Sequence, residues 1–193
     1  MNLKEERTFV MIKPDAVRRG LIGEIISRIE QRGLKVVACR MFQATRNQID
    51  QHYPKDAEWL RRLGEKTMIT YQKYGIDPKE KLGTDNLDKI GQMVRSWLID
   101  FLTSGPVVKL AVEGLHAIDM VRKLCGHSLP NMAELGSVRG DYSVDSPTLA
   151  NAEQRAIYNL IHASETPEEA ANEIALWFSN DEVYSYRRAD VDF

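Results

Sequence analysis

The chain has 193 residues, the length of one domain with room for a sizeable insertion. Its net charge of -2 excludes the strongly basic surface of a typical nucleic-acid-binding protein. Hydrophobic residues make up 43%, enough for a full core, and no apolar run approaches the ~20 residues that span a bilayer. Cys39 and Cys125 form no metal-binding or disulfide pattern, and residues 1–7 contain no apolar signal segment, so we expect a cytoplasmic protein.

Strands and helices alternate through the first part of the chain. Residues 7–13 form an apolar run closed by Pro14, which predicts a buried strand with Lys13 at its end. Residues 20–33 carry leucine and isoleucine at helical spacing, and residues 35–44 predict a second strand. Residues 47–63 are predicted to be helical, with a break near Pro54.

The second part of the chain continues this alternation. Residues 107–113 predict a third strand, residues 116–125 predict a helix, and residues 183–186 predict a last strand. Thr166 and Glu169 have the spacing of a capping box that opens a further helix. This order predicts an α+β sandwich, with helices on one face of a mainly antiparallel sheet.

Two stretches exceed what a compact sandwich needs. Residues 64–102 are charged and partly helical, and residues 141–158 form a polar loop. Neither stretch has the low complexity of a flexible linker, so we interpret both as ordered insertions within one domain.

The chemistry is concentrated around His162, which ends a short apolar run just before a predicted helix N-terminus. A helix N-terminus attracts anions, and a neutral imidazole is a good nucleophile at pH 7. His162 is therefore a candidate phosphate acceptor. The alternative is a partly buried loop histidine with a structural hydrogen bond.

Three cations accompany this histidine in the sequence. Lys13 ends a strand, Arg122 lies in the last turn of a helix, and Arg139 lies in a turn. Together they have the charge needed to bind a magnesium-bound nucleoside triphosphate. Taken singly, each is also typical of a solvated surface charge, and spacing alone does not show that they converge.

The sequence resembles the nucleoside diphosphate kinases through blocks that occur in order along most of the chain. The blocks are residues 6–9, 12–15, 19–26, 52–53, 104–108, 113–115, 139–141, 159–165 and 173–178. The resemblance implies a ferredoxin-like α+β sandwich, with a four-stranded antiparallel sheet and helices on one face, and a single domain over residues 1–193. It also implies transfer of the γ-phosphoryl group of a nucleoside triphosphate to a nucleoside diphosphate, in a ping-pong cycle.

The resemblance assigns a role to each matching catalytic residue. His162 matches the phosphorylated histidine, and Glu173 matches the carboxylate that accepts a hydrogen bond from its other ring nitrogen. That bond fixes the tautomer, which makes physical sense for a nucleophile. Tyr53 and Ser164 match polar supports near the phosphoryl group.

The nucleotide-binding residues follow from the same resemblance. Lys13, Arg122 and Arg139 match phosphate-binding cations, and Asn159 matches the amide that, with Lys13, contacts the sugar hydroxyl. Mg²⁺ is expected to be held by nucleotide oxygens and water, with no protein metal ligand. The family forms hexamers or tetramers, so we expect a homo-oligomer.

The sequence departs from the family pattern in several places. Ser128 stands where a threonine commonly contacts the β-phosphate. The segment between Tyr53 and Ser104 is longer than usual by about thirty residues, an insertion near residues 64–96, and the loop between Asp141 and Tyr158 is longer by about ten. The longer segment leaves four candidates for the aromatic that stacks on the base: Trp59, Tyr71, Tyr74 and Trp97.

Two other functions are compatible with this fold. A silent relative that only binds nucleotide is opposed by the intact set of site residues, and nucleotide binding without turnover would support it. A single-strand nucleic-acid-binding protein is opposed by the net charge and by the lack of a basic stripe with interleaved aromatic residues. We therefore expect nucleotide substrates and neither nucleic acid nor membrane as partners.

Overall fold

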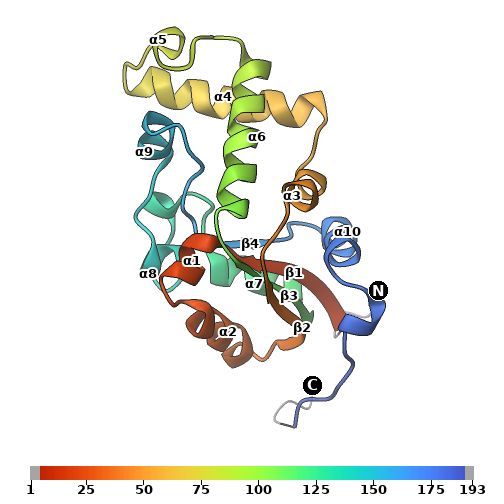
Figure 1. Ribbon diagram of the computed structural model, residues 1–193. Helices are drawn as coiled ribbons and strands as arrows, with labels where there is room; N and C mark the ends of the chain where they lie inside the picture. The colour runs from red at the N-terminus through yellow and green to blue at the C-terminus, as the bar shows by residue number, and fades with distance from the viewer. Residues whose placement is uncertain (1–4, 190–193) are drawn as a thin grey trace.

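The computed structural model describes residues 5–189 and is built around a four-stranded antiparallel sheet (Figure 1). The strand order is β2–β3–β1–β4. The strands are β1 Glu6–Ile12, β2 Lys35–Phe42, β3 Val107–Gly114 and β4 Ile161–Ala163. The predicted ferredoxin-like α+β fold is confirmed. Residues 1–4 of the polar N-terminal stretch lie outside the described residues.

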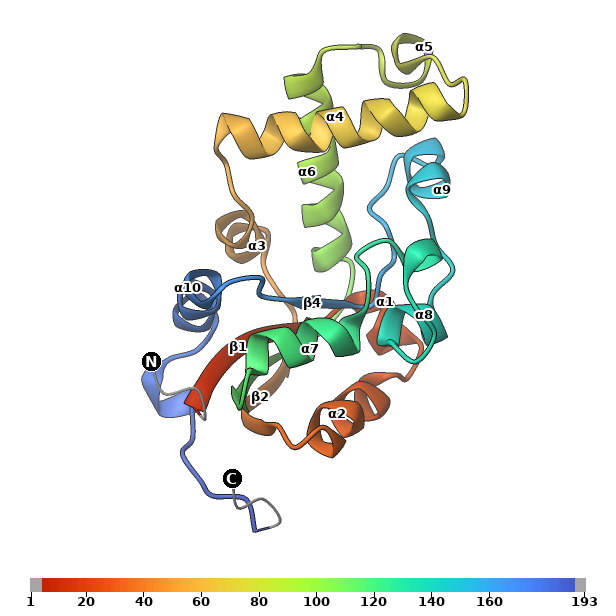
Figure 2. The ribbon, with the colours of Figure 1, turned by 180° about the vertical axis from the view of Figure 1, so that it is seen from behind.

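Both faces of the sheet are covered, because β1 is apolar on both sides. Val10 and Ile12 pack with α2 (Ile22–Gln31) and α7 (Ala117–Cys125) on one face, whereas the sequence predicts helices on one face alone. Phe9 and Met11 point to the other face, where residues of three more helices meet them. These helices are α3 Arg46–His52, α6 Leu87–Thr103 and α10 Pro167–Trp177 (Figure 2). A continuous apolar strand is typical of a sheet that is buried on both faces.

The first inserted stretch is a pair of crossing helices. After α3, the chain forms α4 Ala57–Lys73 and a short helix α5 Pro78–Leu82, then returns to the sheet through α6 (Figure 1). Two glycines let the backbones of α4 and α6 touch. A Cβ atom at Gly64 would lie 2.0 Å from the carbonyl oxygen of Leu87, and one at Gly91 would lie 1.9 Å from that of Leu60.

The second stretch packs against the first. The predicted polar loop follows α8 (Val138–Tyr142) and contains a short helix, α9 Pro147–Ala152, which contacts α4. Tyr71 in α4 donates a hydrogen bond of 2.9 Å from its hydroxyl to the Asn151 carbonyl oxygen. The Gln154 side-chain amide donates to the Lys81 carbonyl oxygen at 2.7 Å.

The remaining helical segments are α1 Pro14–Arg18 and the 3₁₀ turns Pro130–Met132 and Asn180–Glu182.

Two details of the predicted elements are wrong. Residues 183–186 do not form a strand: the Tyr184 amide donates to the Val37 carbonyl oxygen at 2.8 Å, beside the irregularity in β2, and no ladder follows. The last strand is β4. Thr166 does cap α10, since its hydroxyl accepts from the Glu169 amide at 3.1 Å, but the Glu169 carboxylate reaches the Glu165 amide and not that of Thr166.

Candidate active site

His162 lies in the three-residue strand β4, which pairs with β1 so that His162 stands opposite Met11. The chain enters β4 through Leu160, whose φ of 68° lies in the left-handed region that non-glycine residues rarely adopt. The strained turn is fixed on both sides. The Lys13 amide donates to the Leu160 carbonyl oxygen at 2.8 Å, and the Asp15 carboxylate accepts from the Leu160 amide at 3.0 Å.

Glu173 connects the histidine to the helix that follows it. Its Oε1 lies 2.7 Å from His162 Nε2, and its Oε2 accepts a bond of 2.6 Å from the Ser164 hydroxyl. A carboxylate only accepts hydrogen bonds, so the neutral His162 ring carries its proton on Nε2. Nδ1, which has no hydrogen bond to the described residues, then keeps its lone pair.

A second imidazole and a tyrosine close the other side of this group. His52 Nδ1 lies 3.3 Å from Glu173 Oε1, and the His52 and His162 ring centres are 4.8 Å apart. The Tyr53 ring packs between His52, at 5.0 Å, and Trp59, at 6.0 Å. Burial and the negative charge of Glu173 raise the pKa of the Tyr53 hydroxyl, so this group remains a donor at neutral pH.

The nucleotide-binding candidates form a second chain of contacts. The Lys13 ammonium donates to Asn159 Oδ1 at 2.6 Å, and Asn159 Nδ2 donates to the Ser128 carbonyl oxygen at 2.9 Å. The Ser128 side chain is exposed beside them. The structure therefore brings together Lys13, Asn159 and Ser128, although they are far apart in sequence.

Arg139 has a role that its sequence position did not suggest. Its buried guanidinium donates to three backbone carbonyl oxygens, those of Asn159 at 3.1 Å, Gly126 at 2.7 Å and Ile161 at 2.6 Å. These bonds hold the segment before His162 against the end of α7. Two of the five guanidinium N–H groups remain for other partners.

Arg122 lies at the rim of this group. Its guanidinium pairs with Glu165 at 2.9 Å, and 43% and 69% of the two side chains are exposed. An ion pair this open to solvent contributes little stability. A stronger anion can therefore displace Glu165 at small cost.

Burial and charge keep the catalytic candidates in defined protonation states. Burial first, and then the positive charge of Lys13, lowers the pKa of His162, which favours the neutral imidazole. Burial and the nearby Arg139 lower the pKa of Lys13 to about 8. Burial raises the pKa of Glu173, while His52 and Ser164 act in the opposite direction.

Side chains able to hold a metal ion meet at the same place. In the part of the chain that the structure describes, one set of three suitable residues occurs, His52, His162 and Glu173, with donor atoms within 4.8 Å of one another. Glu173 Oε1 is already shared by the two imidazoles.

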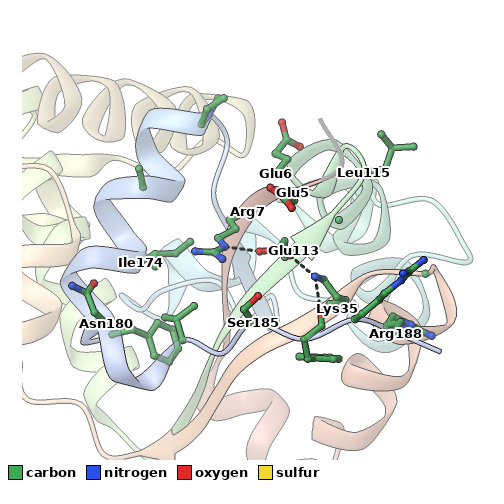
Figure 3. A pocket seen from close by; sticks show the side chains of 18 of the residues that line it. Glu5, Glu6, Arg7, Lys35, Glu113, Leu115, Ile174, Asn180, Ser185 and Arg188 are labelled. Carbon is green, nitrogen blue, oxygen red and sulfur yellow. Dashed lines mark hydrogen bonds and ion pairs between the residues drawn. The ribbon is translucent and has the colours of Figure 1, made fainter. Parts of the chain in front are cut away.

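Two cavities formed by the described residues lie near these elements, and the smaller one touches the site. The smaller cavity, of about 530 Å³, is lined by His52, Tyr53 and Glu173. The larger one, of about 1170 Å³, lies where β1 begins and contains none of the predicted site residues (Figure 3). Glu113 in that cavity already pairs with Arg7, at 2.7 Å, and with Lys35, so its charge is satisfied within the protein.

Sequence reasoning gave no role to two residues that the structure places here, Asp15 and His52. Both fall inside blocks that resemble the family, and that was the only signal in the sequence. Asp15 holds the turn at Leu160, and burial raises its pKa. Their partners are distant in the chain, so spacing could not show the contacts.

The candidates for base stacking are also separated by the structure. Tyr71 is fully buried, and Trp97 packs against the core on the second face of the sheet. Tyr74 is 51% exposed at the far end of α4. Trp59 alone of the four lies against a site candidate, Tyr53.

A neutral histidine held by a carboxylate, with buried cations beside it on a ferredoxin-like sheet, is the arrangement of a phosphotransferase. The sequence model of the family described as nucleoside diphosphate kinase matches residues 6–61 and 87–183. A nucleoside diphosphate kinase of Pyrobaculum aerophilum is 48% identical over 178 residues, which are 92% of this chain and 97% of that protein. The chain belongs to the nucleoside diphosphate kinase family.

Solved structures agree with this assignment. The crystal structure of an NDP kinase from Pyrobaculum aerophilum has a TM-score of 0.91 and 46% identity, covering 94% of this chain and all of that one. A nucleoside-diphosphate kinase from Borrelia burgdorferi, solved as a transition-state mimic with vanadate and ADP, has a TM-score of 0.77 and 34% identity, covering 98% of this chain and 96% of that one. This chain is accordingly a kinase that transfers phosphoryl groups between nucleotides. No helix within residues 5–189 is long and apolar enough to cross a membrane.

Proposed function

We propose that the phosphoryl group is carried on Nδ1 of His162 during the reaction. The observation that carries this proposal is the 2.7 Å contact between His162 Nε2 and Glu173, which leaves Nδ1 as the nucleophilic nitrogen. The Nδ1 lone pair attacks the γ-phosphorus of a nucleoside triphosphate, the bond to the bridging oxygen breaks, and the diphosphate leaves. A second diphosphate then takes the phosphoryl group from Nδ1 by the reverse displacement.

The surrounding residues support this step in three ways. Glu173 holds the ring and offsets the positive charge that forms on it, with Ser164 fixing the carboxylate. Tyr53 supplies a protonated hydroxyl next to the imidazole pair. The positive charges of Lys13 and Arg139 lie close enough to His162 to lower its pKa, and we assign both to the negative charge of the transferred group.

The rest of the nucleotide is assigned to the rim. Arg122 exchanges Glu165 for a phosphate, Ser128 offers its exposed hydroxyl to the β-phosphate, and Asn159 with Lys13 meets the sugar hydroxyl. Mg²⁺ supplies charge neutralisation when it is bound with the nucleotide, and we place it on phosphate oxygens and water.

We further propose a single domain over residues 1–193 with an insertion near residues 64–96. The cytoplasmic location and the hexameric or tetrameric state stay predictions.

The test follows a labelled phosphoryl group through one cycle. Purified protein is incubated with Mg²⁺ and γ-labelled ATP and then chased with a diphosphate, beside the variants His162→Ala and His116→Asn. Wild type and His116→Asn should carry acid-labile, alkali-stable label that moves to the new triphosphate, and His162→Ala should carry none. Label that persists in His162→Ala contradicts the assignment, and an unlabelled wild type that still binds ATP indicates a silent nucleotide-binding relative.

A further inference from the structure

His52 is a buried histidine without a place in the proposed function. It is the last residue of α3, and 1% of its side chain is exposed. Its ring packs edge-on against His162 and lies 5.7 Å from the Trp177 ring and 6.1 Å from that of Phe9. Burial lowers the pKa of His52, with His162 adding to the effect, so the ring is neutral at pH 7.

The Nδ1 atom of His52 lies between two incompatible neighbours. The indole Nε1 of Trp177 donates a hydrogen bond of 3.3 Å to it, and Glu173 Oε1 lies at the same distance, 3.3 Å, in a contact that is an ion pair only when the ring is protonated. An indole nitrogen only donates and a carboxylate only accepts, so one tautomer of His52 cannot satisfy both. The other ring nitrogen, Nε2, is buried and has no hydrogen-bond partner among the described residues.

The charge on Glu173 decides which of the two neighbours forms the hydrogen bond with His52 Nδ1. Each tautomer leaves one buried N–H unpaired, at Trp177 or at His52 Nε2, so this cost is similar in both. A proton on Nδ1 makes a charge-assisted bond to the carboxylate, roughly twice as strong as the neutral bond from the indole. The opposite tautomer would also point the Nδ1 lone pair toward the negative Glu173 oxygen.

We propose that His52 is a positioning residue for phosphoryl transfer, donating from Nδ1 to Glu173 Oε1. Glu173 already accepts hydrogen bonds from His162 at 2.7 Å and from Ser164 at 2.6 Å, and the proposed bond from His52 forms across the 3.3 Å contact, so that donors hold both carboxylate oxygens. His52 thus orients the carboxylate that orients the nucleophile, and it neither touches the nucleotide nor moves a proton. This inference rests on the proposed role of His162.

The tautomer can be read without catalysis. Long-range ¹H–¹⁵N spectra of the resting protein at pH 7 show which nitrogen of each imidazole carries the proton, with the His52 and His162 signals assigned by their absence in single variants. We expect the proton on Nδ1 in His52 and on Nε2 in His162. A proton on Nε2 of His52 overturns the proposal, whether or not the protein proves to be phosphorylated.

Matched substitutions test the consequence for the reaction. In His52→Asn the amide N–H takes the place of Nδ1, in His52→Gln it takes the place of Nε2, and Gln51→Ala changes an exposed neighbour as a control. Single-turnover phosphorylation should slow about tenfold in His52→Gln, the loss of one charged hydrogen bond, and stay within about threefold of wild type in His52→Asn. Nucleotide affinity should be unchanged in all three variants.

Two further results separate the possible failures. Equal rates in His52→Asn and His52→Gln, with both folded by thermal melting, overturn the positioning role. A wild type that never labels His162 removes the proposed function instead, and the tautomer measurement still decides the hydrogen bond. If neither variant folds, the same spectrum of the unaltered protein decides.

Discussion

Replacing Glu173 with glutamine isolates the contribution of one buried negative charge. Glutamine keeps the shape of the side chain, and its carbonyl oxygen can still accept from His162 Nε2, while its amide can face the Ser164 hydroxyl. The charge is lost, and the bond with Ser164 reverses its direction, because the amide donates to the hydroxyl oxygen. Because 8% of the Glu173 side chain is exposed, solvent screens this charge weakly.

The expected effect follows from the hydrogen bond at 2.7 Å between Glu173 and His162. A bond to a charged group contributes about 1.5–3 kcal/mol and a neutral one about 1 kcal/mol, so the change costs about 1–2 kcal/mol. The imidazole becomes positively charged only as the phosphoryl group bonds to it. The cost therefore falls on the transition state, and phosphorylation should slow by about 5- to 30-fold.

Nucleotide affinity and stability should respond differently from the rate. Glu173 contacts neither Lys13 nor Arg122, so the dissociation constant for ATP should not change. Burial raises the pKa of Glu173 above its ordinary value, so the carboxylate charge present at neutral pH is less stable in the folded protein than in the unfolded chain. Glutamine should therefore leave the melting temperature equal or higher.

The assay is quench-flow labelling with γ-labelled ATP, together with calorimetric titration of a non-hydrolysable analogue. Glu168→Gln is the control, because Glu168 is an exposed carboxylate in the first turn of the same helix. A phosphorylation rate within twofold of wild type for Glu173→Gln refutes the reasoning. So does a slower rate that is explained entirely by weaker binding.

Three other changes probe the rest of the structure. Gly91→Ala should lower the melting temperature by about 4–8 °C, since its Cβ would lie 1.9 Å from the Leu60 carbonyl oxygen. The control Gly23→Ala, in open space on α2, should not lower it. Equal melting temperatures of the two variants contradict the close crossing of α4 and α6. The affinity for ATP should fall as pH rises through about 8, where Lys13 loses its charge. An affinity for ATP that does not change from pH 7 to about 9.5 argues against phosphate binding by Lys13. Arg139→Lys keeps the charge, but a lysine cannot bind all three carbonyl oxygens, so the free energy of unfolding in denaturant titrations should fall by about 2 kcal/mol. An unchanged unfolding midpoint contradicts the structural role of Arg139.

The elements with a strong local signal were predictable from the sequence. Pro14 after an apolar run marks the end of β1, because proline has no backbone N–H for the ladder. Gly33 follows α2, because glycine readily adopts the left-handed φ of 86° found there. The three residues of β4 carry no such signal, since their pairing depends on β1 about 150 residues earlier. Residues 183–186 have the composition of a strand but form none. The short helix α9 was hidden because its helical run is only six residues long.

The site was predictable in its members and less so in its contacts. His162, Glu173 and Ser164 lie within one strand–helix unit, so their hydrogen bonds are nearly local. Arg139 and His52 find their partners through the tertiary fold. A sequence can show that Arg139 is available, but only the fold shows that three of its donors bind backbone carbonyl oxygens.

Two electrostatic requirements conflict at His162, and the structure meets both with the same groups. A nucleophilic imidazole has to be neutral, whereas a site for phosphate has to be positive. The positive charge of Lys13, added to burial, lowers the pKa of His162, so the cation that attracts the phosphate also keeps the proton off the nucleophile. Arg139 adds a charge held in place by backbone carbonyl oxygens, so the field does not need to reorganise as negative charge moves during transfer. The negative charge of Glu173 lies on the opposite side of the imidazole, beside Nε2. There it stabilises the positive charge that the ring acquires once Nδ1 has bonded to phosphorus.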